Sequence, residues 1–222
     1  MNKNILKRII TSSFLVSLLF SCLYYSDLSW KILVIFFSII CFYEFNNLLN
    51  KIYKINTYKI IIKLLVIFYL CFFYFLLIKI KIEFGEEFIL ILLISCIFSD
   101  VGGYIIGKLF GGPKLTKISP NKTISGALGS ILFTVVGTTL FILYLQKINN
   151  QFNFFISSLL LYLWLVLMSI YCQAGDLFVS YLKRKAKIKN TGNLLPGHGG
   201  LLDRLDGILF AVPMGVLTYL II

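Results

Sequence analysis

Charged and titratable side chains are scarce in this sequence. Asp and Glu together number 9 in 222 residues, charged residues make up 14%, and histidine occurs once, at His198. With 59% hydrophobic residues and a mean hydropathy of +0.92, this composition excludes an ordinary soluble domain. One histidine and few acids also leave few candidates for a strong catalytic base.

Cysteines are few and scattered. Five cysteines lie in or at the ends of apolar runs, without close pairing: Cys22, Cys41, Cys71, Cys96 and Cys172. This placement argues against a disulfide framework or a zinc site. Internal repeats, low-complexity linkers and a second domain are not visible either, so we predict one domain over residues 1–222.

Apolar runs dominate the rest of the chain. About 20 apolar residues cross the ~30 Å of hydrocarbon in a bilayer. Seven runs qualify as candidates, and the last is short enough to require tilt: Ile9–Tyr25, Ile32–Leu49, Ile60–Ile78, Phe88–Ile106, Ile124–Leu145, Phe154–Cys172 and Ile208–Ile222. The predicted fold is therefore all-α, a polytopic membrane protein with about seven transmembrane helices.

The positive charges predict an orientation. With the N-terminus inside, all but four of the 21 Lys and Arg residues fall in cytoplasmic segments; the exceptions are Lys31, Lys79, Lys81 and Lys147. Such a bias is typical of multi-pass proteins of the cell (inner) membrane, whose positive loops stay in the cytoplasm. The net charge of +12 is thus better explained by anionic membrane lipids than by nucleic acid, which we do not expect as a partner.

One polar stretch, from Asp176 to Gly207, stands out from this background. It holds three carboxylates, Asp176, Asp203 and Asp206, and the last two are spaced to share one face of a helix. Together the three would suit Mg²⁺, which binds a few carboxylates together with substrate phosphates. In isolation, Asp203 and Asp206 could instead simply favour a helix start beside Arg204.

Cations and glycines in the same stretch indicate phosphate chemistry. Lys183, Arg184, Lys189 and Arg204 could neutralise phosphate charge, whereas Lys185 and Lys187 are assigned to the lipid surface. The turn Pro196-Gly197-His198-Gly199-Gly200 would let backbone N–H groups approach an anion. A lone histidine is more often a turn residue than a base, so His198 is predicted to contact nucleotide or support the turn.

An upstream loop offers a second set of polar groups. Ser119-Pro120-Asn121-Lys122-Thr123 precedes a predicted helix, where hydroxyls, a cation and helix N-terminal amides could bind phosphate. The alternative is an ordinary helix cap, since Ser, Thr and Pro are common at helix starts. The sequence alone leaves both readings open.

These motifs resemble those of the phosphatidate cytidylyltransferases, or CDP-diacylglycerol synthases. The resemblance rests on G-D-L-x-x-S-x-x-K-R from Gly175, then Lys189, then P-G-H-G-G-x-x-D-R-x-D, and on the upstream S-D-x-x-x-Y-x-x-G and S-P-N-K-T runs. It implies a Mg²⁺-dependent integral membrane enzyme, dimeric, acting at the cytoplasmic face on CTP and phosphatidic acid. The implied catalytic set is Asp176, Asp203, Asp206, Lys122, Lys183, Arg184, Lys189 and Arg204, with the three acids as metal ligands. The implied substrate-binding set is Ser119, Lys122, Thr123, Ser180, Gly197, His198, Gly199 and Gly200.

Three positions depart from that family's usual pattern. Asn190 stands where Asp is usual, and Val179 and Ser125 stand where Glu is common. Each departure removes a negative charge, so a weaker or altered metal preference is an open alternative. Two other functions also remain: a CTP-dependent lipid-alcohol kinase, and a membrane transporter without catalysis, although transport sites usually lie near the bilayer midplane.

Overall fold

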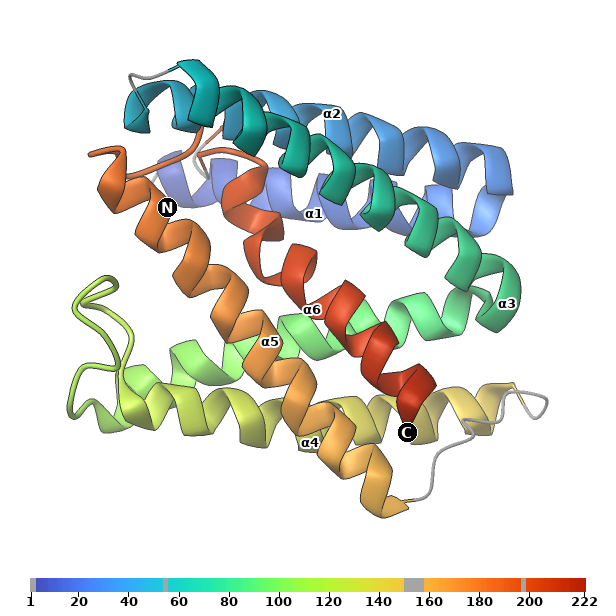
Figure 1. Ribbon diagram of the computed structural model, residues 1–222. Coiled ribbons are helices and arrows are strands. Elements are labelled where there is room, and N and C mark those ends of the chain that lie inside the picture. The colour runs from blue at the N-terminus through green and yellow to red at the C-terminus, as the bar shows by residue number, and fades with distance from the viewer. Residues whose placement is uncertain (1–2, 54–55, 150–157, 197–198) are drawn as a thin grey trace. The chain divides into compact units, whose positions relative to one another are not determined.

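A computed structural model describes residues 3–53, 56–149, 158–196 and 199–222. Over these ranges the chain forms helices, with two isolated β-bridges and no strand (Figure 1). The predicted all-α class is confirmed. The helices are α1 (Lys3–Tyr25), α2 (Asp27–Ile52), α3 (Asn56–Phe110), α4 (Ile124–Ile148), α5 (Ser158–Lys185) and α6 (Leu202–Ile221).

Helix α3 joins two of the predicted spans in one element of 55 residues. At ~1.5 Å per residue, such a helix is far longer than a bilayer is thick. The backbone of Gly85 leaves helical geometry, with φ 81° and ψ −179°, and so divides α3 between the two apolar runs. This left-handed φ is open to glycine at little cost, which explains why a glycine stands at the break.

The predicted count of seven crossings is not confirmed. Five helices among the described residues are long and apolar enough to span a membrane, with α3 counted once. The apolar part of α1, Ile10–Tyr25, is shorter. The count therefore depends on whether the two parts of α3 and the short α1 each cross the bilayer.

Large hydrophobic side chains project outward along these helices. Phe14, Phe68, Phe75 and Leu140 are each more than 60% exposed. A soluble protein rarely leaves so much apolar surface in water, whereas lipid tails cover it at no cost. Together with the long apolar helices, this exposure identifies a membrane protein.

The described chain groups into two compact units. The first comprises Met1–Glu86 and Leu182–Leu205, and the second comprises Glu87–Tyr181 and Asp206–Ile222. In the first unit, Leu48 of α2 packs with Leu182 and Ala186 around the end of α5. The prediction of a single domain over the whole chain stays a prediction.

Close helix packing through small residues characterises the second unit. The C-terminal part of α3 runs beside α4, as Figure 1 shows. A Cβ on Gly102 would lie 2.5 Å from the carbonyl oxygen of Gly129, and one on Gly107 would lie 3.3 Å from the Cα of Gly126. Small residues let helix backbones approach in this way inside a membrane. This contact fixes the start of α4, where the upstream polar loop ends.

Candidate active site

The polar stretch from Asp176 to Gly207 is a loop only in its middle. Helix α5 continues to Lys185 and α6 begins at Leu202, so the connection spans residues 186–201. Asp203 and Asp206 both lie in the first two turns of α6, three residues apart, as the spacing predicted. The candidate side chains are therefore held mostly by rigid helix ends rather than by a flexible loop.

Lys122 and Asp176 form an ion pair in the second unit. The Lys122 Nζ lies 2.8 Å from Asp176 Oδ2, and the two side chains are 30% and 19% exposed. Lys122 comes from the loop before α4, and Asp176 comes from α5. The structure thus brings together one cation and one carboxylate that are 54 residues apart in sequence.

The loop before α4 is held by its own hydrogen bonds. Thr123 Oγ1 accepts from the backbone N–H of Gly126 at 3.1 Å, which makes Thr123 the N-cap of α4. The N–H of Lys122 donates to the carbonyl of Ser119 at 3.1 Å, and Ser125 donates its hydroxyl to the carbonyl of Gly111. The cap interpretation of Thr123 is confirmed, and Ser119 supplies a backbone turn that presents Lys122.

Asp206 lies in the same unit as Asp176, at a close approach of α5 and α6. A Cβ on Gly175 would lie 2.5 Å from the Asp206 carbonyl oxygen, and one on Gly207 would lie 3.0 Å from Asp176 Oδ1. The two glycines therefore let the helices meet beside the two acids. Asp206 Oδ1 also accepts from the N–H of Gly207 at 3.1 Å.

Lys183 and Asp203 form a second ion pair, in the first unit. The Lys183 Nζ lies 2.7 Å from Asp203 Oδ1, with side-chain exposures of only 15% and 9%. Asp203 Oδ2 accepts from the N–H of Thr191 at 2.8 Å and from the N–H of Gly200 at 3.1 Å. This carboxylate therefore ties the two ends of the α5–α6 loop together.

Glu44, which the sequence reasoning missed, completes this network. Its carboxylate on α2 is 2% exposed and accepts from the Thr191 hydroxyl at 2.7 Å and from the N–H groups of Leu201 and Leu202 at 3.0 and 2.9 Å. The signal was present in the sequence. An acid within a predicted membrane span is functional by default, and Glu44 lies inside the run Ile32–Leu49.

The remaining predicted residues differ in their exposure. Arg184, Lys189 and Arg204 are exposed, and Ser180 is half-buried on α5, four residues after Asp176. Gly197 and His198 lie outside the described residues, between Leu195 and Gly199, whose backbones pair in an isolated bridge. Gly199 has a positive φ of 93°, and a Cβ there would lie 3.0 Å from Asp203 Oδ2. The glycines at 199 and 200 thus have a packing role besides the predicted approach to an anion.

Two of the departures from the family pattern have a structural account. Val179 is buried at 3% exposure, where it serves as an apolar contact. Ser125 anchors the loop before α4 through its bond to Gly111. Nothing in the structure explains Asn190, beyond its closeness to Gly199.

The described acidic residues could supply only some of the ligands of a divalent metal ion. Among the described residues, no group of three or more His, Cys, Asp and Glu side chains is arranged to hold a metal ion. Asp176 and Asp206 give the second unit two carboxylates, a number that Mg²⁺ commonly takes from protein alongside phosphates and water. Asp203 belongs to the first unit, so a three-acid site stays a prediction.

The sequence profile of the Cytidylyltransferase family matches residues 51–222, which include every predicted site residue. The chain belongs to the cytidylyltransferase family. Among similar proteins are phosphatidate cytidylyltransferases of Helicobacter pylori strain J99, 43% identical over 139 residues (62% of this chain, 49% of the relative), and of Bacillus subtilis strain 168, 39% identical over 145 residues (65% of this chain, 51% of the relative). The phosphatidate cytidylyltransferase of Rickettsia bellii is 41% identical over 128 residues (56% of this chain, 55% of the relative). The matched region spans about half the length of these relatives.

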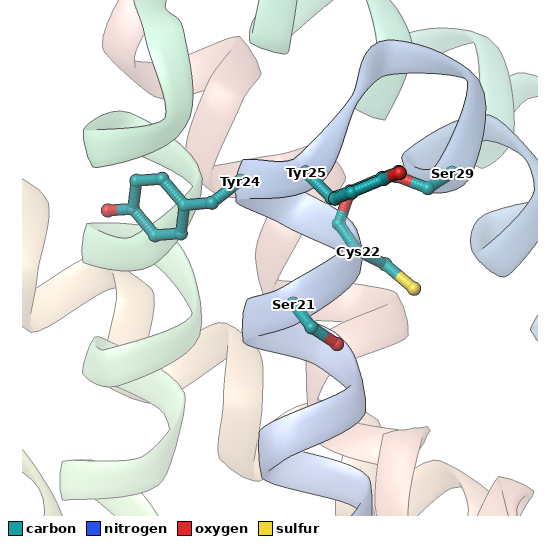
Figure 2. A pocket seen from close by; sticks show the side chains of 5 residues that line it. All are labelled: Ser21, Cys22, Tyr24, Tyr25 and Ser29. Carbon is teal, nitrogen blue, oxygen red and sulfur yellow. The ribbon is translucent and has the colours of Figure 1, made fainter.

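A surface pocket is formed by residues of α1 and α2. It is lined by Ser21, Cys22, Tyr24, Tyr25 and Ser29 at the junction of α1 and α2 (Figure 2). Ser29 donates its hydroxyl to the carbonyl of Cys22 at 2.8 Å, so its polar atom already serves the helix junction. None of the predicted site residues lines this pocket.

Proposed function

We propose that this chain transfers a cytidylyl group from CTP to phosphatidic acid, giving CDP-diacylglycerol and pyrophosphate. The family match carries the proposal, because it includes both Lys–carboxylate pairs and the glycine-rich loop. The names of the similar proteins supply the lipid substrate. The chain would thereby act in phospholipid biosynthesis as a nucleotidyltransferase.

The proposed reaction does not require a strong base from the protein. The second pKa of a phosphate monoester is near ~6, so phosphatidic acid is mostly dianionic at neutral pH. One of its phosphate oxygens attacks the α-phosphorus of CTP, and the bond from that phosphorus to the oxygen bridging to the β-phosphate breaks as pyrophosphate leaves. A chain with one histidine can support this reaction, because the nucleophile arrives already deprotonated.

The main task of the side chains is to reduce the electrostatic repulsion between CTP and phosphatidic acid, which are both anions. Lys122 and Lys183 are held at helix ends, where each can offset phosphate charge. Arg184, Lys189 and Arg204 are exposed cations of the same helix–loop–helix segment. We assign Ser119, Thr123, Ser180 and the Gly197–Gly200 turn to substrate positioning, with His198 as a nucleotide contact.

Asp176 and Asp206 are the residues that would hold Mg²⁺, with Asp203 as the third candidate. Bound Mg²⁺ supplies Lewis-acid stabilisation of the CTP phosphates. Lys122 sits on a flexible stem beside Asp176 and can turn from the carboxylate to a phosphate oxygen. Asp176 therefore organises the cation as well as offering a ligand.

The distribution of Lys and Arg supports a location in the cell (inner) membrane with the active-site segments facing the cytoplasm, where CTP is available. The lipid substrate would reach α5 and α6 from the inner leaflet, which also supplies the anionic lipids expected around the basic helix ends. A homodimer is part of the same proposal and rests on the family resemblance alone.

Product analysis tests the proposal directly. Purified protein in detergent is given phosphatidic acid, a lipid alcohol, Mg²⁺ and CTP labelled at the α-phosphate, with a parallel reaction labelled at the γ-phosphate. Label from the α-phosphate in the lipid, and γ-label in pyrophosphate, is the expected result. If the γ-label enters a lipid alcohol instead, the chain is a CTP-dependent kinase and the proposal is wrong.

A further inference from the structure

Glu44 is a buried carboxylate that the reaction itself does not require. It lies on α2, 2% exposed, seven residues before the first residue matched by the family profile. Its three hydrogen-bond donors in the described chain are all neutral: the Thr191 hydroxyl and the backbone N–H groups of Leu201 and Leu202. Burying a carboxylate costs free energy unless hydrogen-bond donors compensate for the lost water. These three donors supply that compensation.

The donors identify what Glu44 stabilises. Helix α6 begins at Leu202, and the N–H of Leu205 donates to the carbonyl of Leu201. The first N–H groups of a helix have no acceptor within it, and here α2 supplies that acceptor from a distant part of the sequence. A negative charge is also favoured at a helix N-terminus. Glu44 therefore caps α6 just before Asp203.

Two glycines of the loop lie close to the same carboxylate, that of Glu44. A Cβ on Gly192 would lie 2.6 Å from Glu44 Oε1, and a Cβ on Gly200 would collide with Glu44 Oε2 and Thr191 Oγ1. A Cβ at either glycine would force the Glu44 carboxylate to shift. Gly192 and Gly200 therefore both lie directly against the Glu44 carboxylate.

Thr191 connects Glu44 to the Lys183–Asp203 pair. Its hydroxyl lies 2.7 Å from Glu44 Oε2 and 3.1 Å from Asp203 Oδ2. A hydroxyl carries one proton, and the shorter distance assigns that proton to Glu44. Asp203 accepts hydrogen bonds from the N–H groups of Thr191 and Gly200 and from the ammonium of Lys183.

We propose that Glu44 is a positioning residue for the CTP-binding loop, fixing Thr191, Leu201 and Leu202 and through them Asp203 and Lys183. The proposal rests on the proposed function, which assigns the Gly197–Gly200 turn of this loop to substrate positioning, with His198 as a nucleotide contact. Groups that orient a ligand-binding residue through hydrogen bonds typically cost about 10–100-fold in affinity or activity when removed.

Kinetics of Glu44→Gln separate positioning from simple structural support. The amide keeps the side-chain shape but puts an N–H₂ donor against other donors. We expect the KM for CTP to rise about 10–100-fold, with the KM for phosphatidic acid changed by less than about threefold. A purely structural role would lower kcat through a smaller active fraction and leave the KM for CTP unchanged, and that result would overturn the proposal. Glu83→Gln is the matched control, because Glu83 is half exposed and pairs with Lys79, one turn away on α3.

Amide hydrogen exchange tests the same proposal without activity. The N–H groups of Leu201 and Leu202 should exchange about tenfold faster or more in Glu44→Gln than in the wild type or Glu83→Gln, because an opened amide exchanges with water. Unchanged exchange would contradict the proposal. If the Gln variant does not fold, Glu44→Asp, which withdraws the charge by one methylene, should show the same change to a smaller degree. A wild type that fails to use CTP, while Glu44→Gln still accelerates exchange, would refute the proposed function and leave the loop-fixing role intact.

Discussion

The two Lys–carboxylate pairs of this chain look alike in sequence and differ in structure. Asp203 accepts hydrogen bonds from Lys183 and from the N–H groups of Thr191 and Gly200, and its side chain is 9% exposed. Asp176 is 19% exposed, and within the described residues Lys122 is its hydrogen-bond partner. The first pair is built into a loop, whereas the second keeps a carboxylate oxygen available for a ligand.

The sequence assigned Asp176, Asp203 and Asp206 the same role as metal ligands, and this difference indicates that their roles differ. A carboxylate whose oxygens already serve several protein donors has less capacity for a metal than one with a single partner. Asp176, together with Asp206, is therefore the stronger candidate for the metal, and Asp203 the stronger candidate for organising the loop. The predictions below test that division.

Asp176→Asn is expected to have the largest effect. Loss of one carboxylate charge should reduce cytidylyl transfer about 10³-fold, because the proposed Mg²⁺ site and the position of Lys122 both depend on this carboxylate. The melting temperature in detergent should change by less than about 2 °C, since the Lys122–Asp176 pair is partly exposed. Activity within about tenfold of the wild type would contradict the assignment.

Asp203→Asn should lower turnover about 10²-fold for a different reason. Whichever way the amide turns, its N–H₂ faces either the Lys183 ammonium or the N–H groups of Thr191 and Gly200. The protein should remain folded, but exchange at Gly200 should accelerate, as it should not in Asp176→Asn. Equal exchange in the two variants would remove the distinction between the pairs.

The two lysines should differ in their effect on stability. Lys183→Met leaves Asp203 buried without its cation and is expected to cost about 3 kcal/mol of unfolding free energy. Lys122→Met, in the more exposed pair, should cost about 1 kcal/mol while still impairing transfer. Thermal unfolding of both variants in one detergent measures the difference, and an equal loss would show that burial does not separate them.

Lys185→Gln should have the smallest effect. Its ammonium lies 5.0 Å from the ring centroid of Tyr53, a contact worth about 0.5–1 kcal/mol at an exposed site. Transfer activity should stay within about twofold of the wild type, consistent with the assignment of Lys185 outside the reaction. A larger loss of activity would move Lys185 into the phosphate-binding set.

Sequence periodicity and hydropathy were enough for the helices but not for their ends. The apolar runs locate every helix, because burial in lipid demands them. The runs could not reveal that helical geometry continues past Ile78 to the break at Gly85, nor that α5 extends past its apolar residues to carry Asp176 and Lys183. Polar residues at a membrane surface can continue a helix without any hydrophobic signal.

The site was predictable where it is local and not where it is assembled from distant parts. Motif spacing placed Asp203 and Asp206 on one helix, and the loop motif singled out Lys122. The contact between Lys122 and Asp176 joins residues 54 positions apart, and Glu44 meets Leu201 across 157 positions. Spacing carries no information about such pairings, because only the fold brings them together.

Metal binding by the two Asn variants tests the division of labour most directly. Mn²⁺ takes the same oxygen ligands as Mg²⁺, and its binding to purified protein with CTP can be followed by electron paramagnetic resonance. We predict that Asp176→Asn loses Mn²⁺ binding and that Asp203→Asn retains it with an affinity within about tenfold of the wild type. Loss of binding in Asp203→Asn, with binding retained in Asp176→Asn, would contradict the account and make Asp203 the metal ligand.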